Sequence, residues 1–262
     1  SPFLQFDDAQ IYKSQGEVLR YDTTKEFESV EAWSTFDASK NGVGYDPREY
    51  LNAVFDGKSI YFAPLSNKDG KSHGEVLRYD TTKDFESAQA WSTFDPSKNG
   101  VGNNPKGFGD GIFDGKFVYF SPFHNGEDHH GEVLRYDTTK DFESVEAWST
   151  FDPSKNGVGV SPIGFMDISF DGQFLYFAPR LLDDIGNEIL RYDTTKDFES
   201  VEAWSTFNPM HDAPFLPVGY SNGVYENDYV YFPQINNGVT TGGGVLRYDT
   251  TKDFESVEAW ST

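Results

Sequence analysis

The chain has 262 residues, a formal net charge of −22 from 43 acidic and 21 basic side chains, and no cysteine. This charge argues against nucleic acid or an anionic membrane as a partner, because phosphate binding needs clustered Lys and Arg. The lack of cysteine excludes a disulfide framework, a cysteine zinc site and a thiol nucleophile. No apolar run approaches the roughly 18 residues that span a bilayer, so no membrane insertion is expected. Aromatic residues make up 17% of the chain although its mean hydropathy is −0.60, which favours many short strands over thick helices.

A repeat organises the whole chain. The Tyr of the word Leu-Arg-Tyr-Asp precedes a Trp by 12 residues in five places, and successive Trp residues lie 56 to 58 residues apart. A second motif, Phe-Asp-Gly-x-x-x-Tyr-Phe-x-Pro, precedes the Leu-Arg-Tyr-Asp motif and is only partly retained in the first copy. A fixed period of this size indicates a repeat architecture. The copies form one domain, 1–262, and span approximately residues 1–36, 37–94, 95–151, 152–207 and 208–262.

In chain order, each copy predicts four short strands, named here A to D. Strand A ends at the Phe-Asp-Gly turn, and strand B is apolar on both faces, as expected for a strand buried between neighbouring sheets. Strand C carries Leu-Arg-Tyr-Asp and strand D carries Trp-Ser-Thr-Phe; the segment between them predicts one helical turn capped by Thr or Asp. The predicted A–B hairpins are Phe6–Tyr12, Val54–Pro64, Ile112–Pro122, Ser169–Pro179 and Val224–Pro233, and the predicted C–D modules are Tyr21–Trp33, Tyr79–Trp91, Tyr136–Trp148, Tyr192–Trp204 and Tyr248–Trp260.

Repeated four-stranded units of this period are typical of β-propeller blades. The chain resembles five-bladed β-propellers with nearly identical blades, of the kind seen in bacterial and lectin-like repeat proteins, over its whole length and through the two repeated words. The resemblance implies an all-β fold of five blades with four antiparallel strands each. A β-solenoid is the alternative, although its rungs are usually shorter. Because the chain runs from a strand A to a strand D, we expect closure without a shared strand and a weak seam between blades 1 and 5, or else a piece of a longer array.

Sequence variation gathers in two kinds of connection. The C–D segment and the A–B turn hardly vary, whereas the B–C and D–A connections differ from copy to copy. In a propeller these two connections share one face. Because binding sites usually lie on loops of a rigid scaffold, the pattern predicts a ligand-binding face, with drift of tolerant loops as the alternative. The candidate ligand residues on this face are Tyr45, Arg48, His124, Asp128, His129, His130, Arg180, His211 and Phe215.

A polar residue occupies the same place at the start of strand A in four copies, in the pattern Pro-x-x-(Tyr/Phe)-x-(Asn/Asp). Strand A is innermost in a propeller, so these side chains should ring the channel near the variable face. Two carboxylates and two amides suit Ca²⁺ or Mg²⁺, and capping of backbone amides or bound water is the alternative. The four candidate metal ligands are Asn52, Asp110, Asp167 and Asn222.

Two further side-chain patterns are open to more than one interpretation. All five histidines lie in the variable connections, where His124, His129 and His130 with an aspartate could bind a transition metal, although solvated loop histidines are the commoner case. The repeated Arg of strand C predicts an ion pair or hydrogen bond between blades, and the repeated Trp predicts packing between blades.

The resemblance also sets the enzymatic alternative, because five-bladed propellers include furanose-cleaving glycosidases. Asp110 and Asp167 would then supply the acid and the nucleophile or base. Near-identical blades argue against catalysis, since a catalytic centre needs asymmetry and supporting residues around it. We therefore expect a non-enzymatic, lectin-like module that binds carbohydrate, outside the cell or on its surface. Another neutral or cationic ligand, or a structural and self-assembling role, remains as an alternative.

Overall fold

The computed structural model describes residues 16–180, 186–209, 219–221, 223–235 and 244–262, together with the backbone of 5–6 and 12–13. These residues form antiparallel strands joined by turns and by single turns of 3₁₀ helix. The fold is therefore all-β in the part of the chain that the structure describes. None of the helices among these residues has the length and apolar character needed to cross a bilayer.

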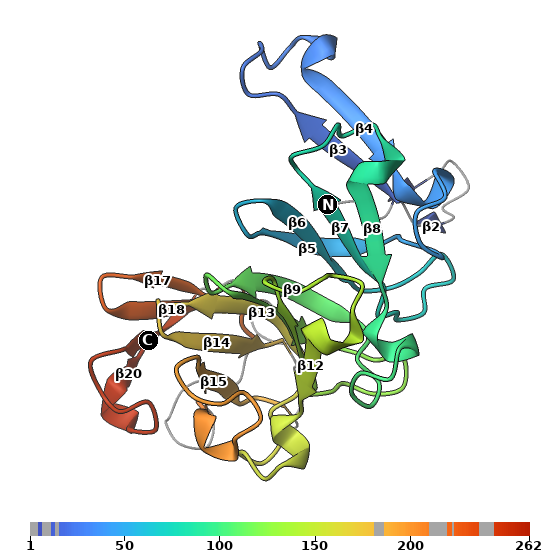
Figure 1. Ribbon diagram of the computed structural model, residues 1–262. Helices are drawn as coiled ribbons and strands as arrows, with labels where there is room; N and C mark the ends of the chain where they lie inside the picture. The colour runs from blue at the N-terminus through green and yellow to red at the C-terminus, as the bar shows by residue number, and fades with distance from the viewer. Residues whose placement is uncertain are drawn as a thin grey trace.

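Repeats 2 to 5 each form one four-stranded antiparallel sheet whose strands follow the order of the sequence (Figure 1). The first strand of each sheet lies beside the first strand of the next one, so strand A is the inner strand, as predicted. Repeat 2 contains β5 (Tyr50–Phe55), β6 (Ser59–Pro64), β7 (Val76–Asp80) and β8 (Trp91–Phe94); repeat 3 contains β9 (Phe108–Phe113), β10 (Phe117–Pro122), β11 (Val133–Asp137) and β12 (Trp148–Phe151); repeat 4 contains β13 (Phe165–Phe170), β14 (Phe174–Pro179), β15 (Ile189–Asp193) and β16 (Trp204–Phe207); repeat 5 contains β17 (Val224–Glu226), β18 (Tyr229–Pro233), β19 (Val245–Asp249) and β20 (Trp260–Ser261).

The Asp-Gly turn between strands A and B is closed by its own side chains. In repeat 2, the Asp56 carboxylate accepts hydrogen bonds from the backbone N–H groups of Lys58 and Ser59, at 2.7 and 2.6 Å. Its other oxygen accepts from the Tyr61 hydroxyl at 2.8 Å. Gly57 takes a φ of +98°, in the left-handed region that favours glycine. The turn word therefore fixes both the reversal of the chain and the orientation of a strand B tyrosine.

The C–D segment contains the predicted helical turn, but its predicted cap is wrong. In repeat 3 the turn is the 3₁₀ helix η5 (Val145–Ala147), and Ser144 holds the N-cap position without a side-chain hydrogen bond. The aspartate and threonines upstream instead form a turn of their own, in which Asp137 accepts from the backbone N–H of Thr139 at 3.0 Å. An aspartate side chain that accepts a hydrogen bond within its own turn is not available to cap the helix that follows.

Neighbouring sheets are joined by aromatic stacking, which confirms the predicted role of the repeated tryptophan. The Phe that ends strand D of one repeat stacks on the Trp of the next: Phe36 on Trp91 (4.8 Å between ring centroids), Phe94 on Trp148 (5.3 Å), Phe151 on Trp204 (5.5 Å) and Phe207 on Trp260 (4.3 Å). The core therefore lies between sheets rather than within one, as in other repeat folds.

The repeated arginine also joins neighbouring sheets. The predicted hydrogen bond between blades is present in repeat 4, where Arg191 Nη1 donates to the Tyr248 hydroxyl at 3.4 Å, and the arginine also makes a cation–ring contact. Its guanidinium lies over the C–D phenylalanine of the following repeat, while its Nε donates to a serine of its own sheet. The cation–ring pairs are Arg20 over Phe85 (4.5 Å), Arg78 over Phe142 (4.5 Å), Arg135 over Phe198 (4.2 Å) and Arg191 over Phe254 (4.3 Å). The weakly hydrated, planar guanidinium suits this contact better than lysine would.

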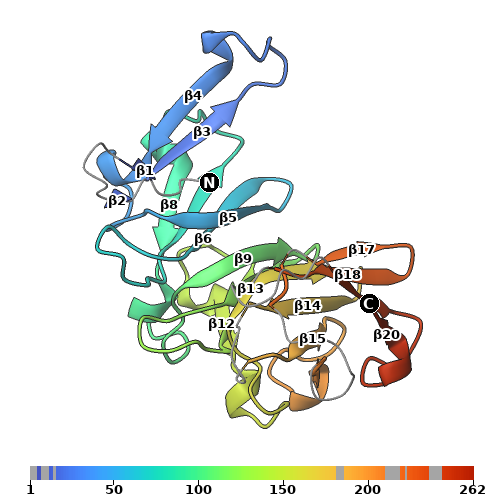
Figure 2. The same cartoon turned by 180° about the vertical axis from the view of Figure 1, so that it is seen from behind.

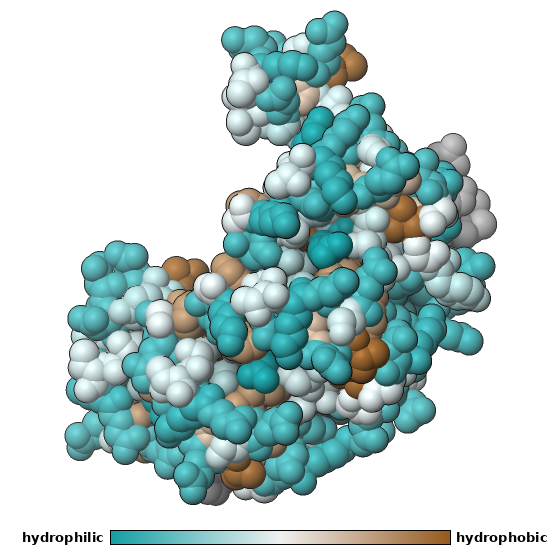
Figure 3. Space-filling model, in the orientation of Figure 1, coloured by the Kyte–Doolittle hydropathy of each residue, from teal (hydrophilic) through white to brown (hydrophobic). Residues whose placement is uncertain are grey.

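Repeat 1 departs from the pattern. Its strands form two separate pairs, β1 (Gln5–Phe6) with β2 (Tyr12–Lys13) and β3 (Glu17–Tyr21) with β4 (Trp33–Asp37). Figures 1 and 2 show β3 and β4 at one end of the array and β17 to β20 at the other. Figure 3 shows the β3–β4 pair projecting beyond the bulk of the molecule. Leu19 and Phe27 of repeat 1 and Val245 of repeat 5 are exposed, so the predicted packing of blades 1 and 5 as separate sheets is not seen among the described residues.

The B–C connection of repeat 1 is shorter than those of the other copies. Its strand B and strand C tyrosines are only 9 residues apart, against 16 to 18 elsewhere. In repeat 2 the longer connection contacts the preceding D–A segment through His73, whose Nε2 lies 3.1 Å from the Arg48 carbonyl oxygen.

Replacing Phe142 by alanine should lower the free energy of unfolding by about 3–5 kcal/mol, because the ring is fully buried between repeats 2 and 3. Phe27→Ala is the matched control: the same position in repeat 1 is 65% exposed, so the change should be small. Urea unfolding followed by tryptophan fluorescence measures both. Equal losses in the two variants would contradict an inter-repeat core.

Candidate ligand-binding face

The B–C and D–A connections meet on one face of the array and line a pocket of about 910 Å³. Two stretches of its wall come from the B–C connections of repeats 2 and 3, at 70–72 and 124–130. Two more come from the D–A connections that lead into repeats 3 and 4, at 103–106 and 152–155. Both classes of variable connection therefore line one site. Its surroundings combine amides, hydroxyls, imidazoles, lysines and carboxylates.

Gly107 holds these connections together. Its N–H donates to the carbonyl of His73 at 3.0 Å, and its own carbonyl accepts from the N–H groups of Phe123 and His124, at 3.0 and 3.2 Å. Its φ is +67°, and a Cβ here would lie 1.8 Å from the His124 carbonyl oxygen. One residue before strand A thus ties two B–C connections into a common wall, and only glycine fits there.

A buried glutamate at the start of strand C holds the D–A connection that precedes its repeat. The Glu132 carboxylate accepts from the backbone N–H groups of Asn103 and Asn104, at 2.7 and 3.0 Å, and from the Thr150 hydroxyl at 3.1 Å. Gly102 approaches this carboxylate with φ +66°, and a Cβ there would lie 2.3 Å from Glu132 Oε1. A carboxylate that accepts several N–H groups makes strong, charge-assisted bonds, so the loop backbone is held in one conformation.

The same clamp recurs in two more repeats. Glu75 accepts from the N–H groups of Tyr45 and Asp46, at 2.7 and 3.0 Å, and Glu188 accepts from Val160 and Ser161, at 2.9 and 2.6 Å. The side chain that follows the clamped glycine differs in every copy. Tyr45 is 86% exposed and Val160 is 92% exposed. Rigid backbone therefore carries interchangeable, outward-pointing side chains.

The B–C loop of repeat 3 is a tight hairpin tip. Asn125 Oδ1 accepts from the N–H groups of Glu127 and Asp128, both at 3.0 Å. His124 and His129 pair across the tip, and their rings lie 5.0 Å apart at 87°. His124, Asp128 and His129 thus line the pocket from one preorganised loop, with Asp128 exposed.

His130 has a different position from its neighbours. It is buried, its Nε2 lies 2.9 Å from the Lys106 carbonyl oxygen, and it contacts the edge of the Phe108 ring. Burial lowers its pKa to about 4. A neutral ring at ordinary pH can donate from Nε2 to that carbonyl, so His130 latches the D–A connection. It does not join a metal cluster, and no group of three His, Asp or Glu side chains suited to a metal occurs among the described residues.

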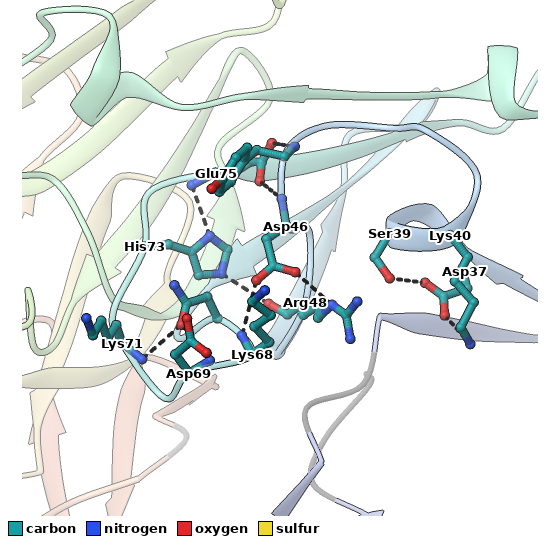
Figure 4. Close-up of polar contacts among 12 residues, drawn as sticks. Asp37, Ser39, Lys40, Asp46, Arg48, Lys68, Asp69, Lys71, His73 and Glu75 are labelled. Carbon is teal, nitrogen blue, oxygen red and sulfur yellow. Dashed lines mark hydrogen bonds and ion pairs between the residues drawn. The ribbon is translucent and has the colours of Figure 1, made fainter.

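An equivalent latch lies in repeat 2, as Figure 4 shows. His73 Nε2 is 3.1 Å from the Arg48 carbonyl oxygen, and burial lowers the pKa of this histidine too. The Arg48 side chain pairs with Asp46, at 2.7 Å from Nε to Oδ1. The exposed Tyr45 ring has Lys98 Nζ above it at 4.7 Å. Tyr45 and Arg48 therefore lie beside this latch and outside the pocket.

One other predicted ligand residue is not brought to the pocket. Arg180 is exposed at the end of β14 and does not line it. His211 and Phe215 lie outside the described residues.

The inner strands do bring together three of the four predicted channel residues. Asp110 on β9 accepts from the N–H of Gly111 at 2.8 Å and interacts with Asn52 on β5 and Asp167 on β13. Burial, reinforced by repulsion from Asp167, raises the pKa of Asp110 to about 7. Asn222 lies outside the described residues. The cation hypothesis stays a prediction, and a proton held on Asp110 can relieve the same repulsion.

Sequence analysis missed the glutamate clamp. Its signal was present: the word Gly-Glu opens strand C at Gly74-Glu75 and Gly131-Glu132, and the word Gly-Val-Gly stands in the D–A connection before it. The two words lie about 30 residues apart, so only the repeat comparison could have linked them.

Comparison with known proteins leaves the chain without a family. No protein-family model and no curated protein matches it. Among solved structures it is similar to PorZ, a bacterial surface component of the type-IX secretion system of Porphyromonas gingivalis, with 10% identity and a TM-score of 0.47 over 84% of this chain and 23% of PorZ. It is also similar to the computationally designed Ika4 protein, with 9% identity and a TM-score of 0.44 over 79% of this chain and 94% of Ika4. The chain thus spans less than a quarter of the PorZ chain.

Replacing Glu132 by glutamine should release the D–A connection into repeat 3. The amide keeps one acceptor but turns an N–H toward a backbone donor, at a cost of about 1–3 kcal/mol. Hydrogen exchange of the Asn103 and Asn104 amides should speed up accordingly. Glu127→Gln, an exposed change in the adjacent loop, should leave both amides protected; equal acceleration there would refute the clamp.

Asp110→Asn should change how stability depends on pH. Because the folded pKa of about 7 lies above the usual aspartate value of 3.8, the folded state holds this proton more tightly. The wild-type chain therefore loses stability as pH rises between these values, by about 4 kcal/mol over the whole interval, and the variant should not. Urea unfolding at about pH 5 and about pH 8 measures the difference. Asp141→Asn, on an exposed turn, is the control, and parallel pH profiles for wild type and Asp110→Asn would contradict the raised pKa.

Proposed function

We propose that the repeats are blades of a β-propeller-type array and that the face formed by the B–C and D–A connections binds carbohydrate. The observation that carries the proposal is the pocket between repeats 2, 3 and 4, whose wall combines segments that differ between copies, at 70–72, 103–106 and 124–130, with the repeated Asp-Pro-Ser-Lys at 152–155. A binding module needs a rigid frame with variable side chains. The glutamate clamps and histidine latches supply such a frame on this face of the array.

The chemistry of the pocket favours an uncharged ligand rich in hydroxyl groups. Asn103, Asn104 and Asn125 can donate and accept, and the imidazoles of His124 and His129 offer both polar atoms and ring faces. Lysines and carboxylates are both present, so neither strongly anionic nor strongly cationic ligands are preferred. Sugars combine such hydrogen bonding with apolar ring faces. A module of this kind would act outside the cell or on its surface.

One observation favours the enzymatic alternative, namely the raised pKa of Asp110 beside Asp167, since a glycosidase needs one carboxyl group protonated near neutral pH. Two others oppose it. Asp167 is buried, and β9 and β13 approach so closely that a Cβ on Gly109 would lie 2.3 Å from the Met166 carbonyl oxygen. The pocket is lined by neither aspartate. We therefore assign this pair to the scaffold, and release of aryl alcohol from furanosides, abolished by Asp110→Asn, would reverse that assignment.

A glycan array probed with the whole chain, with and without EDTA, tests the binding proposal. We expect binding to a limited set of glycans, weakened at least about tenfold in a His124→Ala, Asp128→Asn variant, or about 1.4 kcal/mol. Asp141→Asn, on the invariant C–D segment, is the matched control and should bind like wild type. If no glycan binds in either condition, or if the control loses as much as the pocket variant, the proposal fails.

A further inference from the structure

Each junction between repeats is built from the same two faces. We call leading face the side of a repeat that meets the preceding one, formed by the Leu and Tyr of strand C, the Phe of the C–D segment and the Trp of strand D. The trailing face meets the following repeat and is formed by the Tyr of strand B, the Val or Ile and the Arg of strand C and, in repeats 1 to 4, the Phe of strand D. In repeats 2, 3 and 4 the side chains of both faces are buried, apart from the half-buried arginines.

The leading face of repeat 1 is uncovered. Leu19 is 60% exposed and Phe27 is 65% exposed, whereas the same two positions are at most 2% exposed in every later repeat. Trp33 and Tyr21 are also more exposed than their counterparts. The cluster is nevertheless formed: Tyr21 and Phe27 contact Trp33 at 4.8 and 5.1 Å, in the arrangement seen at the buried junctions. A preformed aromatic cluster faces solvent here.

The trailing face of repeat 5 is uncovered as well. Val245 is 42% exposed, while the equivalent Val76, Val133 and Ile189 are fully buried. Arg247 is exposed and lies over one ring only, that of Tyr229 at 4.5 Å. In repeats 3 and 4 the equivalent arginine lies between two rings, one of its own strand B and one from the following repeat. Arg247 therefore has one free face for an aromatic ring, and Phe27 is the one C–D phenylalanine of the repeat series with no guanidinium over it among the described residues.

We propose that the leading face of repeat 1 binds the trailing face of repeat 5 of a second copy of the chain, head to tail. The contact would reproduce the arginine, valine and tyrosine contacts of the four junctions already present, with Phe27 on Arg247 and the Tyr21–Trp33 pair against Val245 and Tyr231. It would lack their Phe–Trp stack, because strand D of repeat 5 contributes no phenylalanine. The chain cannot satisfy these faces by itself in this arrangement, because they lie at opposite ends of the array (Figures 1 and 2). A contact between two different surfaces is heterologous and extends into rings or filaments.

Complementary variants test this inference. Phe27→Asp blocks the leading face and leaves the trailing face intact, and a Val245→Asp, Arg247→Glu variant does the reverse. Light scattering with size-exclusion chromatography, over about a hundredfold range of concentration, should show the mass of wild type rising with concentration. Each variant alone should stay at the 29.5 kDa of one chain. An equimolar mixture of the two should form a species of twice that mass and nothing larger, since only one productive junction remains.

Two controls keep the outcome decisive. Val160→Asp changes an exposed apolar residue on the ligand-binding face and should associate like wild type. Phe27→Ser replaces Phe27→Asp if circular dichroism shows that the aspartate variant is misfolded. The inference is overturned if wild type stays monomeric throughout the range, if the blocked variants associate like wild type, or if the mixture remains at the mass of one chain.

Discussion

The contact on which the molecule depends is the stack between the phenylalanine that ends one repeat and the tryptophan of the next. A four-stranded sheet of this size cannot bury its aromatic side chains alone, so stability is distributed over nearest-neighbour junctions. Phe207 on Trp260, with centroids 4.3 Å apart and planes 4° from parallel, shows the contact at its closest. The arginine over the neighbouring phenylalanine extends each junction and orients the two sheets. An array built in this way has two uncovered ends unless it closes or associates.

The strand pattern of the fold was predictable from the sequence because each of its determinants is local. Asp-Gly turns in repeats 2 to 4, an Asn-Asp turn in repeat 5, alternating side chains and a constant Tyr-to-Trp spacing specify the sheets of repeats 2 to 5 and their order. The proximity of Asn52, Asp110 and Asp167 was also predictable from the sequence, because residues at the same repeat position on neighbouring inner strands lie close together. Closure was not predictable, because it depends on the angle between successive sheets, which the aromatic junctions set and no motif encodes.

The functional face shows the same division between local and distant determinants. The sequence correctly placed variable connections together but treated His130 as a solvated or metal-binding side chain. Its partner is a backbone carbonyl at Lys106, and carbonyls carry no signal in a sequence. Burial then lowers its pKa and makes a ligand-like histidine a structural one. His124 and His129, which pair at the tip of the same loop, remain available to a ligand.

The clamp explains a coincidence within the sequence itself. Glu75, Glu132 and Glu188 each hold a D–A connection whose clamped turn ends in glycine, and the fifth copy has Gly244 where the glutamate would stand. The connection leading into that copy has also lost the Gly-Val-Gly word. Burying a glutamate without N–H partners would lower the stability of the fold by several kcal/mol. A left-handed glycine turn without the carboxylate acceptor would make no compensating hydrogen bond. Loss of the glutamate removes the physical reason for the Gly-Val-Gly motif, and the reverse also holds, so the two motifs form one clamp. This clamp lets the side chains at positions 45, 103 and 160 differ without disturbing the sheets below them.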